Sequence, residues 1–467
     1  MTDHIDVDVA PTDTLATDLF MDRFGDDTCY VRERKAWFVW DGRRWIIDLG
    51  GDRMTALMQR LVRGIYAKAA AERDASRRQI LANLARHSAA ARTHRAMLQL
   101  ATGRQEHVRN LNDFDVNPFL FNVANGVVDL RTGELREHQR GDLITRISNV
   151  QYDPDARCPR FDQFVNEVFL GDRDLITYIQ RFAGYSLTGD TREQIFTLLY
   201  GVGSNGKSTF LNALHGVLGE YGQATPADTF LPRKSGTATN DLARLAGVRF
   251  VSAIEVESGR RLAEALVKAM TGGDRVPARF LYGEFFEYVP VYKPVLAVNH
   301  LPKIRGGDFG IWRRVRAVPF KARFEGKAVD KELAEKLQVE RCGILAWCVR
   351  GCLEWQRYGL DEVDAVRIAT KAYRAETDIF DAFLRERCER DGDAKVSATE
   401  LRAAYVDWAH PNGEEPVSAN ALGRLLSTLE FAPTHTKSGT IWNGLRLRED
   451  RDVSPDMNGR ASSAAHV

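Results

Sequence analysis

The spacing of hydrophobic residues changes several times along the chain, and each change predicts a different local structure. Aromatic and β-branched residues cluster over residues 28–48 around Asp41 and Gly42, a pattern typical of a β-hairpin. Residues 53–106 are rich in Ala, Arg and Leu and contain no Pro, which predicts two or three helices.

Short apolar runs continue beyond these helices and are separated by further turn signals. Asn125-Gly126 and Thr132-Gly133 lie between such runs, and the pattern again favours a hairpin. Together these segments predict an N-terminal α+β region over residues 28–158.

A different pattern fills the middle of the chain. Apolar runs of strand length begin the segment 194–219 and recur at 248–257 and 293–300, with helical spacing between them. Strands that alternate with helices predict a three-layer α/β domain with a mainly parallel sheet. Beyond Phe320 the pattern becomes helical through about residue 372.

The C-terminal part predicts a smaller unit. Ser397 and Glu400 form a capping box ahead of an amphipathic helix, a second helix follows, and a hairpin is expected around Ser438-Gly439. Helix, helix and hairpin together predict a winged helix. Such domains bind either nucleic acid or protein, and the basic candidates for phosphate contact are Arg424, Lys437 and Arg446.

Composition and charge narrow the class of protein. The chain has 65 Lys and Arg against 64 Asp and Glu, so any nucleic-acid site must be a local basic patch. No stretch approaches the roughly 18 apolar residues of a membrane-spanning helix, and the acidic N-terminus does not resemble a signal peptide. The six cysteines include no C-x-x-C pair, and we interpret Cys348 and Cys352 as core residues. We therefore expect a cytoplasmic protein without a membrane partner.

The stretch "GVGSNGKS" carries the clearest chemical signal. It satisfies G-x-x-x-x-G-K-[ST] between a predicted strand and a predicted helix, the context of a phosphate-binding loop. Lys207 supplies a charge to the β- and γ-phosphates of ATP, and Ser208 supplies a hydroxyl to Mg²⁺. The predicted nucleotide contacts are Gly201, Val202, Gly203, Ser204, Asn205, Gly206, Lys207, Ser208 and Thr209.

Acidic, amide and basic residues follow the loop in an informative order. Glu255 and Glu257 end the second apolar run, and Glu255 is the stronger candidate for holding Mg²⁺ with Ser208 and polarising the attacking water. Asn299 ends the third run and could orient that water or sense the γ-phosphate. Arg313 and Arg314 could stabilise charge on the transferred phosphate of a neighbouring subunit, which favours an oligomeric ATPase.

At these residues the sequence strongly resembles the helicase part of the phage and plasmid primase-helicases, a group of superfamily 3 that includes the poxvirus primase-helicase. The resemblance covers roughly residues 118–320 and is carried by four stretches. They are "LFNVANGVVDLRTGEL", "FAGYSLTGDTREQIFTLLYGVGSNGKSTFLNAL", "EVESGRRLAEALVKAMTGGDRVPARFLYGEFFEYVPVYKPVLAVNHLPKIRG" and "GIWRRVRAVPF".

The resemblance implies an AAA+-like P-loop ATPase that forms a hexameric ring, translocates on single-stranded DNA and unwinds forks. It assigns Lys207 and Ser208 to the Walker A motif, Glu255 to Walker B and Asn299 to the sensor. Either Arg313 or Arg314 matches the arginine finger, with a slight preference for Arg314.

The same resemblance implies a β-hairpin that points into the ring channel. Its candidate DNA contacts are Lys268, Arg279, Tyr282 and Lys293, with Phe285 and Phe286 as stacking or packing groups. The apparent tip holds Gly283 and Glu284, where related sequences often carry a basic residue, so the identity of the DNA contact stays open.

We therefore expect an α/β protein with an AAA+-like core, an α+β N-terminal region and a C-terminal winged helix. The expected parts are a flexible N-terminus (1–27), the N-terminal region (28–158), the ATPase domain (159–322), a helical segment (323–375), the winged helix (376–450) and a disordered tail (451–467).

No primase-polymerase domain is expected ahead of residue 28, so a separate primase or polymerase is a possible partner. The expected setting is phage, prophage or plasmid replication in a bacterial cytoplasm. The alternatives are an origin-binding initiator that uses ATP only for assembly and a P-loop kinase.

Overall fold

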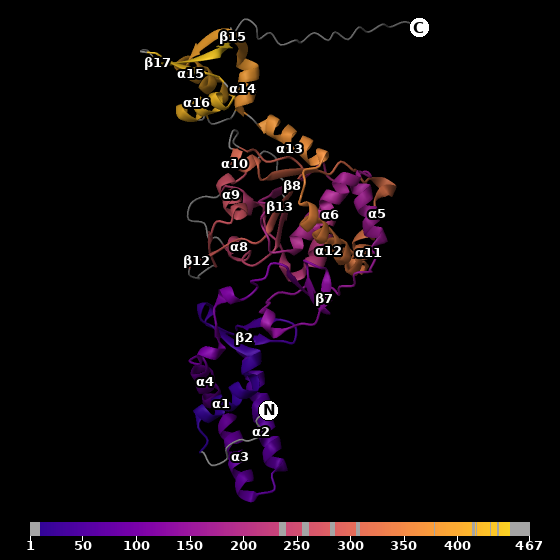
Figure 1. Cartoon of the computed structure of the whole chain (residues 1–467), viewed down its shortest axis with the longest axis vertical. Helices are drawn as coiled ribbons and strands as arrows, with labels where there is room; N and C mark the ends of the chain where they lie inside the picture. Colours follow the sequence, from indigo (N-terminus) through magenta and orange to yellow (C-terminus); the bar gives the residue numbers. More distant parts are fainter. Residues whose placement is uncertain are drawn as a thin grey trace.

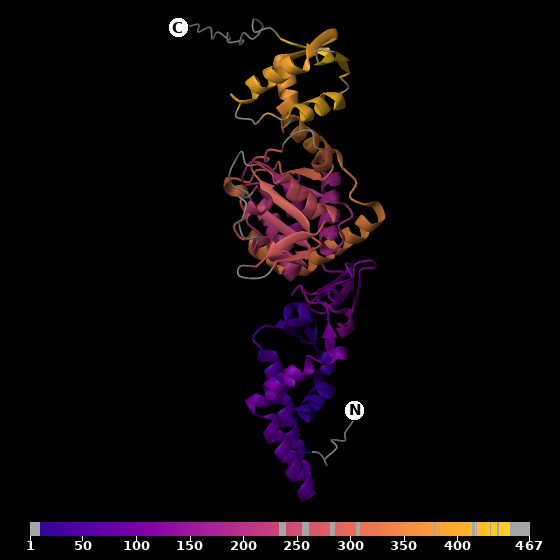
Figure 2. The same cartoon turned by 90° about the vertical axis from the view of Figure 1, so that its left-hand side faces the viewer.

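The chain is elongated, with its N-terminal region at one end and its C-terminal unit at the other (Figures 1 and 2). The computed structural model describes residues 10–232, 240–254, 261–280, 285–304, 309–377, 379–412, 416, 418–429, 431–436 and 439–448. The predicted tail, 451–467, lies outside these residues.

The N-terminal region begins with a helix that the sequence analysis did not predict. Helix α1, Asp13–Phe24, starts at Thr12, whose side chain accepts a hydrogen bond from the Leu15 amide. Its residues Phe20 and Phe24 are buried against the neighbouring helices. The prediction of a flexible stretch over residues 1–27 is therefore wrong for its described second half.

A small sheet and three helices follow α1. The strands β1 (Thr28–Val31), β2 (Ala36–Trp40), β3 (Trp45–Asp48) and β4 (Val108–Arg109) form a sheet of order β3-β2-β1-β4. Strands β2 and β3 pair antiparallel around the predicted turn at Asp41-Gly42. The predicted helical segment forms α2 (Asp52–Ala71), α3 (Ala75–Ser88) and α4 (Ala91–Ala101).

A second sheet lies between this region and the central domain. It consists of β5 (Leu120–Val123), β6 (Gly126–Asp129) and β7 (Glu134–Arg136) in antiparallel order. The predicted turn signal Asn125-Gly126 lies where β5 turns into β6, with Gly126 as the first residue of β6, and Thr132-Gly133 lies between β6 and β7.

The central domain is built on a parallel sheet. Its strands are β8 (Phe196–Tyr200), β9 (Gly222–Ala224), β10 (Phe250–Ile254), β13 (Lys293–Val298) and β14 (Val315–Pro319), in the order β14-β8-β13-β10-β9. All described pairings between them are parallel. The carboxyl ends of β8, β13 and β14 therefore lie at one edge, where parallel sheets usually bind ligands.

Helices cover both faces of this sheet, so the domain has three layers. Side chains of one face, such as Leu199 and Val295, pack on α5 (Pro159–Val168), α6 (Arg173–Leu187), α7 (Lys207–Leu218) and α12 (Arg341–Tyr358). Side chains of the other face, such as Leu198 and Leu296, join a core with residues of α8 (Asn240–Ala243), α9 (Glu264–Gly272), α10 (Phe309–Trp312) and α13 (Asp364–Thr377). The three-layer α/β arrangement with a parallel sheet confirms the prediction.

Helices α6 and α12 approach each other closely because each carries a glycine at the contact. A Cβ atom at Gly184 would lie 2.0 Å from the Cys352 amide nitrogen, and one at Gly351 would lie 2.1 Å from the Gln180 carbonyl oxygen. Cys348 and Cys352 are buried in this core, as predicted.

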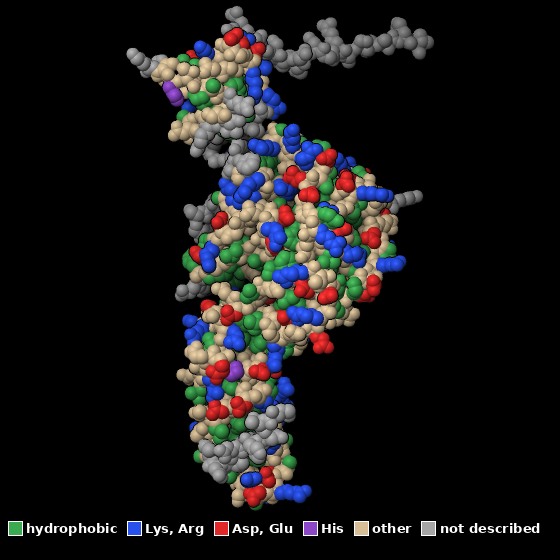
Figure 3. Space-filling view, viewed as in Figure 1, with side chains coloured by type: hydrophobic (Ala, Val, Ile, Leu, Met, Phe, Trp, Pro, Cys, Tyr) green, Lys and Arg blue, Asp and Glu red, His purple; other side chains and the backbone are tan. Residues whose placement is uncertain are grey.

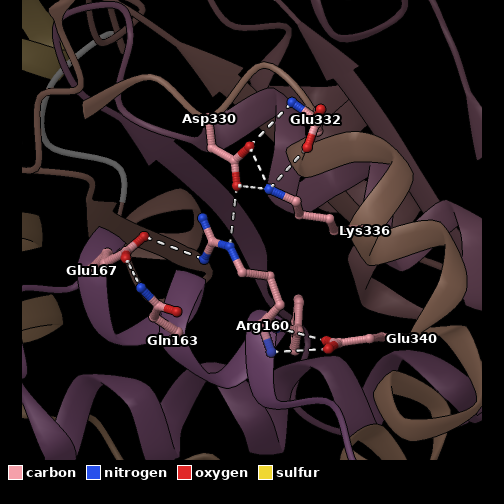
Figure 4. A network of polar contacts seen from close by, with 8 residues as sticks. Arg160, Gln163, Glu167, Asp330, Glu332, Lys336 and Glu340 are labelled. Carbon is pink, nitrogen blue, oxygen red and sulfur yellow. Dashed lines mark hydrogen bonds and ion pairs between the residues drawn. The ribbon is translucent and has the colours of Figure 1, made fainter. Parts of the chain in front are cut away.

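A polar network fastens the segment after β14 to α5 (Figure 4). The Glu340 carboxylate accepts hydrogen bonds from the first-turn amides of Arg160 and Phe161, at 3.0 and 2.9 Å. Arg160 also pairs with Asp330, which binds Lys336 at 3.0 Å and lies ahead of α11 (Leu333–Val339). Bonding to Lys336 lowers the pKa of Asp330. The network holds residues 330–340 against the start of α5.

The C-terminal unit contains two elements more than predicted. Its elements are α14 (Ile379–Arg387), β15 (Cys388–Ser397), α15 (Ala398–Ala409), α16 (Ala419–Thr428), β16 (Pro433–Thr436) and β17 (Gly439–Leu447). The predicted capping box of Ser397 and Glu400 opens α15. Strand β17 pairs with both β15 and β16.

Within the described ranges, every helix is too short or too polar to cross a lipid bilayer. On the face seen in Figure 3, acidic and basic side chains are interspersed over the central domain.

Candidate nucleotide site and nucleic-acid contacts

The glycine-rich turn between β8 and α7 has a conformation that requires glycine. Gly206 has φ of +88°, and a Cβ atom there would lie 2.7 Å from Cγ2 of Val168 on α5. Helix α7 begins at Lys207, so its first amides face the turn without intrahelical partners. The turn thus has the local geometry that the phosphate-loop pattern predicts.

Lys207 is the central charged group of this turn. Its side chain is buried, and Nζ donates to the Gly201 carbonyl at 2.6 Å, Asn205 Oδ1 at 3.0 Å and Asn299 Oδ1 at 3.3 Å. Burial lowers the pKa of Lys207. All three acceptors are neutral, and no carboxylate pairs with this ammonium among the described residues. A buried cation bonded only to neutral oxygens is well suited to an anionic ligand.

The position of Asn299 follows from strand order. Strand β13 lies next to β8 in parallel register, with Val298 opposite Tyr200, so the residues after both strands meet at the same edge. The Gly201 amide donates to the Val298 carbonyl at 3.3 Å. Asn299 is exposed apart from its contact with Lys207. The structure therefore brings two of the predicted site residues together.

The segment after β14 forms the other wall of the turn, which sequence reasoning did not predict. Asn205 is buried and donates to the Phe320 carbonyl at 3.3 Å, and the Phe324 amide donates to the Ser204 carbonyl at 2.8 Å. A Cβ atom at Gly201 would lie 2.2 Å from the Phe320 oxygen. This segment fixes the shape of the turn.

The remaining predicted nucleotide contacts lie at the outside of the turn. Val202, Gly203, Ser204 and Ser208 are exposed, and Thr209 is half-buried. A ligand can therefore reach the turn from solvent.

The predicted metal ligands are described only in part. Glu255 and Glu257 lie outside the described residues, directly after β10. Ile254, the last residue of β10, is paired with Ala297 of β13, so β10 ends close to the site edge. Among the described residues no group of three His, Cys, Asp or Glu side chains could hold a metal ion.

The two arginines after α10 differ sharply in exposure. Arg314 is buried, and its guanidinium donates to Thr271 Oγ1 at 3.0 Å and to the Gly310 carbonyl at 2.6 Å. Arg313 is exposed. The preference for Arg314 as the arginine finger is therefore wrong, because its guanidinium is bound inside its own subunit; Arg313 remains the candidate.

The predicted DNA contacts also separate into two groups. Arg279 belongs to the hairpin of β11 (Val276–Arg279) and β12 (Phe285–Tyr288), and its guanidinium carbon lies 4.7 Å from the ring centroid of the exposed Phe285. Lys268 is half-buried on α9. Tyr282, Gly283 and Glu284 lie outside the described residues.

Lys293 cannot serve as a DNA contact, and this prediction is wrong. The side chain is buried and donates to the carbonyls of Thr188 and Asp190 at the end of α6. Its neighbour Arg249 is also buried and donates to the carbonyls of Leu187 and Leu120. Burial holds the pKa of Lys293 well below its usual value. These cations join the sheet to α6 and to β5.

In the C-terminal unit the candidate phosphate contacts are only partly described. Arg446 pairs with Glu389 at 2.7 Å. Lys437 and the side chain of Arg424 lie outside the described residues.

Comparison with known proteins places this architecture among viral helicase-like proteins. Residues 17–170 match the family model described as D5 N terminal like. "Putative helicase L207/L206" of Acanthamoeba polyphaga mimivirus is 28% identical over 327 residues, which cover 65% of this chain and 34% of that protein. "Putative helicase 022R" of Frog virus 3 (isolate Goorha) is 28% identical over 401 residues, which cover 68% of this chain and 41% of that protein. The chain thus spans less than half the length of these relatives.

One solved structure shares the fold. The A form apo structure of the NrS-1 C terminal region has a TM-score of 0.50 and 9% identity, and the match covers 92% of this chain and 100% of that one. The chain is thus an α/β protein of this fold, and its sequence relatives are named putative helicases. The chain is therefore similar to D5-like primase-helicases, as the resemblance in its sequence predicts.

Proposed function

We propose that the chain is an ATP-dependent DNA helicase of superfamily 3 that assembles into a hexameric ring for phage, prophage or plasmid DNA replication. The observation that carries the proposal is the contact between Lys207 and Asn299 at the carboxyl edge of the parallel sheet. A P-loop ATPase needs a cation for the phosphates and a polar group for the attacking water in one place. These two side chains supply both.

The substrate in this proposal is ATP. The first amides of α7 and the Lys207 ammonium bind its β- and γ-phosphates, which replace the neutral oxygens now bonded to Lys207. Mg²⁺, held through Ser208 with Glu255 and Glu257, neutralises phosphate charge when bound. The buried ammonium without a described carboxylate partner fits this anionic ligand.

The remaining roles divide between one subunit and the next. Asn299 is exposed toward the site and orients the attacking water. Arg313 is exposed and reaches the phosphates bound by a neighbouring subunit, while the buried Arg314 holds α10 against α9 through Thr271. Hydrolysis then depends on the interface between subunits.

The DNA contacts in this proposal lie outside the nucleotide site. The β11–β12 hairpin carries Arg279 against the exposed ring of Phe285, a pairing that can meet a phosphate and a base. We interpret the C-terminal unit as a winged helix, since two helices and a three-stranded sheet follow α14. The helicase names of the relatives support the proposal, and a separate primase or polymerase is a proposed partner.

The decisive experiment measures ATP hydrolysis with and without single-stranded DNA, and unwinding of a labelled fork. We expect DNA to stimulate hydrolysis, and Lys207→Ala to abolish hydrolysis and unwinding while the thermal midpoint stays near wild type. Hydrolysis that DNA does not stimulate, with no unwinding, would contradict the helicase. ATP-dependent assembly on duplex DNA without unwinding would instead favour the initiator alternative.

A further inference from the structure

The helices α2, α3 and α4 form a unit at the end of the molecule remote from the nucleotide site (Figures 1 and 2). Their apolar faces pack together with α1 through buried residues such as Met58, Leu84 and Met97. The opposite faces are open to solvent. Any charge on those faces is therefore accessible to a partner.

The charge on this unit differs from the charge of the whole chain. Residues 52–101 hold ten Lys and Arg against three Asp and Glu, while the whole chain holds 65 against 64. The basic side chains are all exposed, and nine of them are Arg. They are Arg53, Arg60, Arg63, Lys68, Arg73, Arg77, Arg78, Arg86, Arg92 and Arg95.

The packing of α1 on α2 brings a further arginine, Arg23 of α1, close to Arg60 of α2. The guanidinium carbons of Arg23 and Arg60 lie 5.5 and 5.4 Å from the ring centroid of the same residue, Phe24. Gly64 permits this approach, since a Cβ atom there would lie 3.2 Å from Nη1 of Arg23. Two like charges over one ring repel each other, so an anion between them would stabilise the arrangement.

Several arginines of this surface have no carboxylate partner among the described residues. Among the described residues no ion pair involves Arg60 or Arg63, and the Arg77 side chain has no hydrogen bond or ion pair. Tyr66, one turn after Arg63 on α2, is 45% exposed and offers a ring beside these cations. Exposed arginines with an exposed aromatic ring are typical of surfaces that follow a phosphate backbone.

We propose that the solvent-exposed faces of α2, α3 and α4 bind the phosphate backbone of a nucleic acid, as a second contact separate from the central domain. Arg rather than Lys dominates, and its planar group binds phosphate oxygens in pairs. The contact is independent of sequence because side chains reach phosphates rather than base edges. The inference extends the proposed function but does not depend on ATP hydrolysis.

The test measures binding of a labelled single-stranded oligonucleotide to the full chain by fluorescence anisotropy, without nucleotide, over a range of salt concentrations. Arg63→Gln/Arg77→Gln removes two phosphate contacts. We expect affinity to fall about tenfold at low salt, and the plot of log affinity against log salt to become shallower by about 1.4, since each contact contributes about 0.7.

A matched control removes the same charge elsewhere. Arg173 and Arg357 are exposed on α6 and α12, and neither side chain has a described partner, so Arg173→Gln/Arg357→Gln should leave the slope unchanged. Equal slopes for wild type and Arg63→Gln/Arg77→Gln would overturn the proposal. So would equal losses in both double variants, or binding of polyglutamate in preference to the oligonucleotide.

The outcome separates this inference from the helicase proposal. If wild type neither hydrolyses ATP nor unwinds DNA, but Arg63→Gln/Arg77→Gln still has a shallower slope than wild type, the surface stands and the helicase proposal fails. If DNA stimulates hydrolysis but the slope of Arg63→Gln/Arg77→Gln is unchanged, the surface fails alone.

Discussion

Lys207 and Asn299 are 92 residues apart in the sequence, yet the Lys207 ammonium donates to Asn299 Oδ1 at 3.3 Å. Their contact arises because β13 is inserted beside β8 in parallel register. The first residue of α7 and the residue after β13 therefore share one edge. In the proposed reaction both side chains face the γ-phosphate, but only Lys207 is needed to bind it.

This division of roles predicts distinct kinetics for Asn299→Ala. We expect kcat for ATP hydrolysis to fall about 100-fold, as when one polar group at a transition state is removed, while ATP binding stays within about threefold of wild type. Steady-state hydrolysis and binding of a fluorescent ATP analogue measure the two effects. His300→Ala, at the next exposed position, should change neither. An unchanged kcat in Asn299→Ala would refute the role.

The two arginines after α10 should have opposite phenotypes. Arg314→Ala removes buried bonds to Thr271 and Gly310, so we expect a loss of about 2–3 kcal/mol in the free energy of unfolding. Arg313→Ala should leave stability unchanged and abolish hydrolysis in the assembled protein. Mixing Arg313→Ala with Lys207→Ala subunits should restore part of the activity, because mixed interfaces pair an intact arginine with an intact lysine. Failure of this rescue would show that Arg313 does not act on the neighbouring subunit.

The contact between α6 and α12 predicts a large effect from one methyl group. In Gly351→Ala the new Cβ would lie 2.1 Å from the Gln180 carbonyl oxygen, so the helices must separate. We expect unfolding at lower denaturant, with a loss of about 2 kcal/mol or more. In the control Gly216→Ala the nearest atom is Cδ of Arg341 at 3.4 Å, and the better helix propensity of Ala should keep stability equal or raise it. Equal midpoints for the two variants would contradict the close packing.

Turn and helix-cap signals in the sequence predicted much of the fold, because each depends only on residues that are close together in the chain. The turn at Asp41-Gly42 and the capping box of Ser397 and Glu400 act over short stretches, and both occur as predicted. Helix α1 was missed because its acidic sequence has weak amphipathic periodicity and its stability comes from packing Phe20 against distant helices. The cap at Thr12 was the available signal.

At the site, the sequence predicted which residues take part better than it predicted what their side chains contact. The phosphate-loop pattern located Lys207, because the motif and its flanking elements are contiguous. Lys293 was wrongly assigned to DNA and Arg314 to a neighbouring subunit. Their actual hydrogen-bond partners are backbone carbonyls and a hydroxyl that lie elsewhere in the fold. Such partners leave no charge pattern in the sequence.

His215 on α7 predicts a pH dependence of stability. Its Nε2 lies 2.7 Å from Oγ of Ser252 on β10, and burial between helix and sheet lowers the pKa of His215 below 6.5. The unfolded chain therefore binds a proton at this residue more readily than the folded protein does. The stabilising contribution is fully present above about pH 6.5 and is lost as pH falls through and below this value, by at most about 1.4 kcal/mol per pH unit.

The corresponding experiment compares urea unfolding of wild type and His215→Gln between pH 8 and pH 5.5. Wild-type stability should fall more steeply toward acid than that of His215→Gln, so the difference between the two curves changes with pH. His300→Gln removes an exposed histidine and should keep the wild-type slope. If the His215→Gln curve runs parallel to wild type throughout, the neutral imidazole does not contribute to the stability of the packing between α7 and β10.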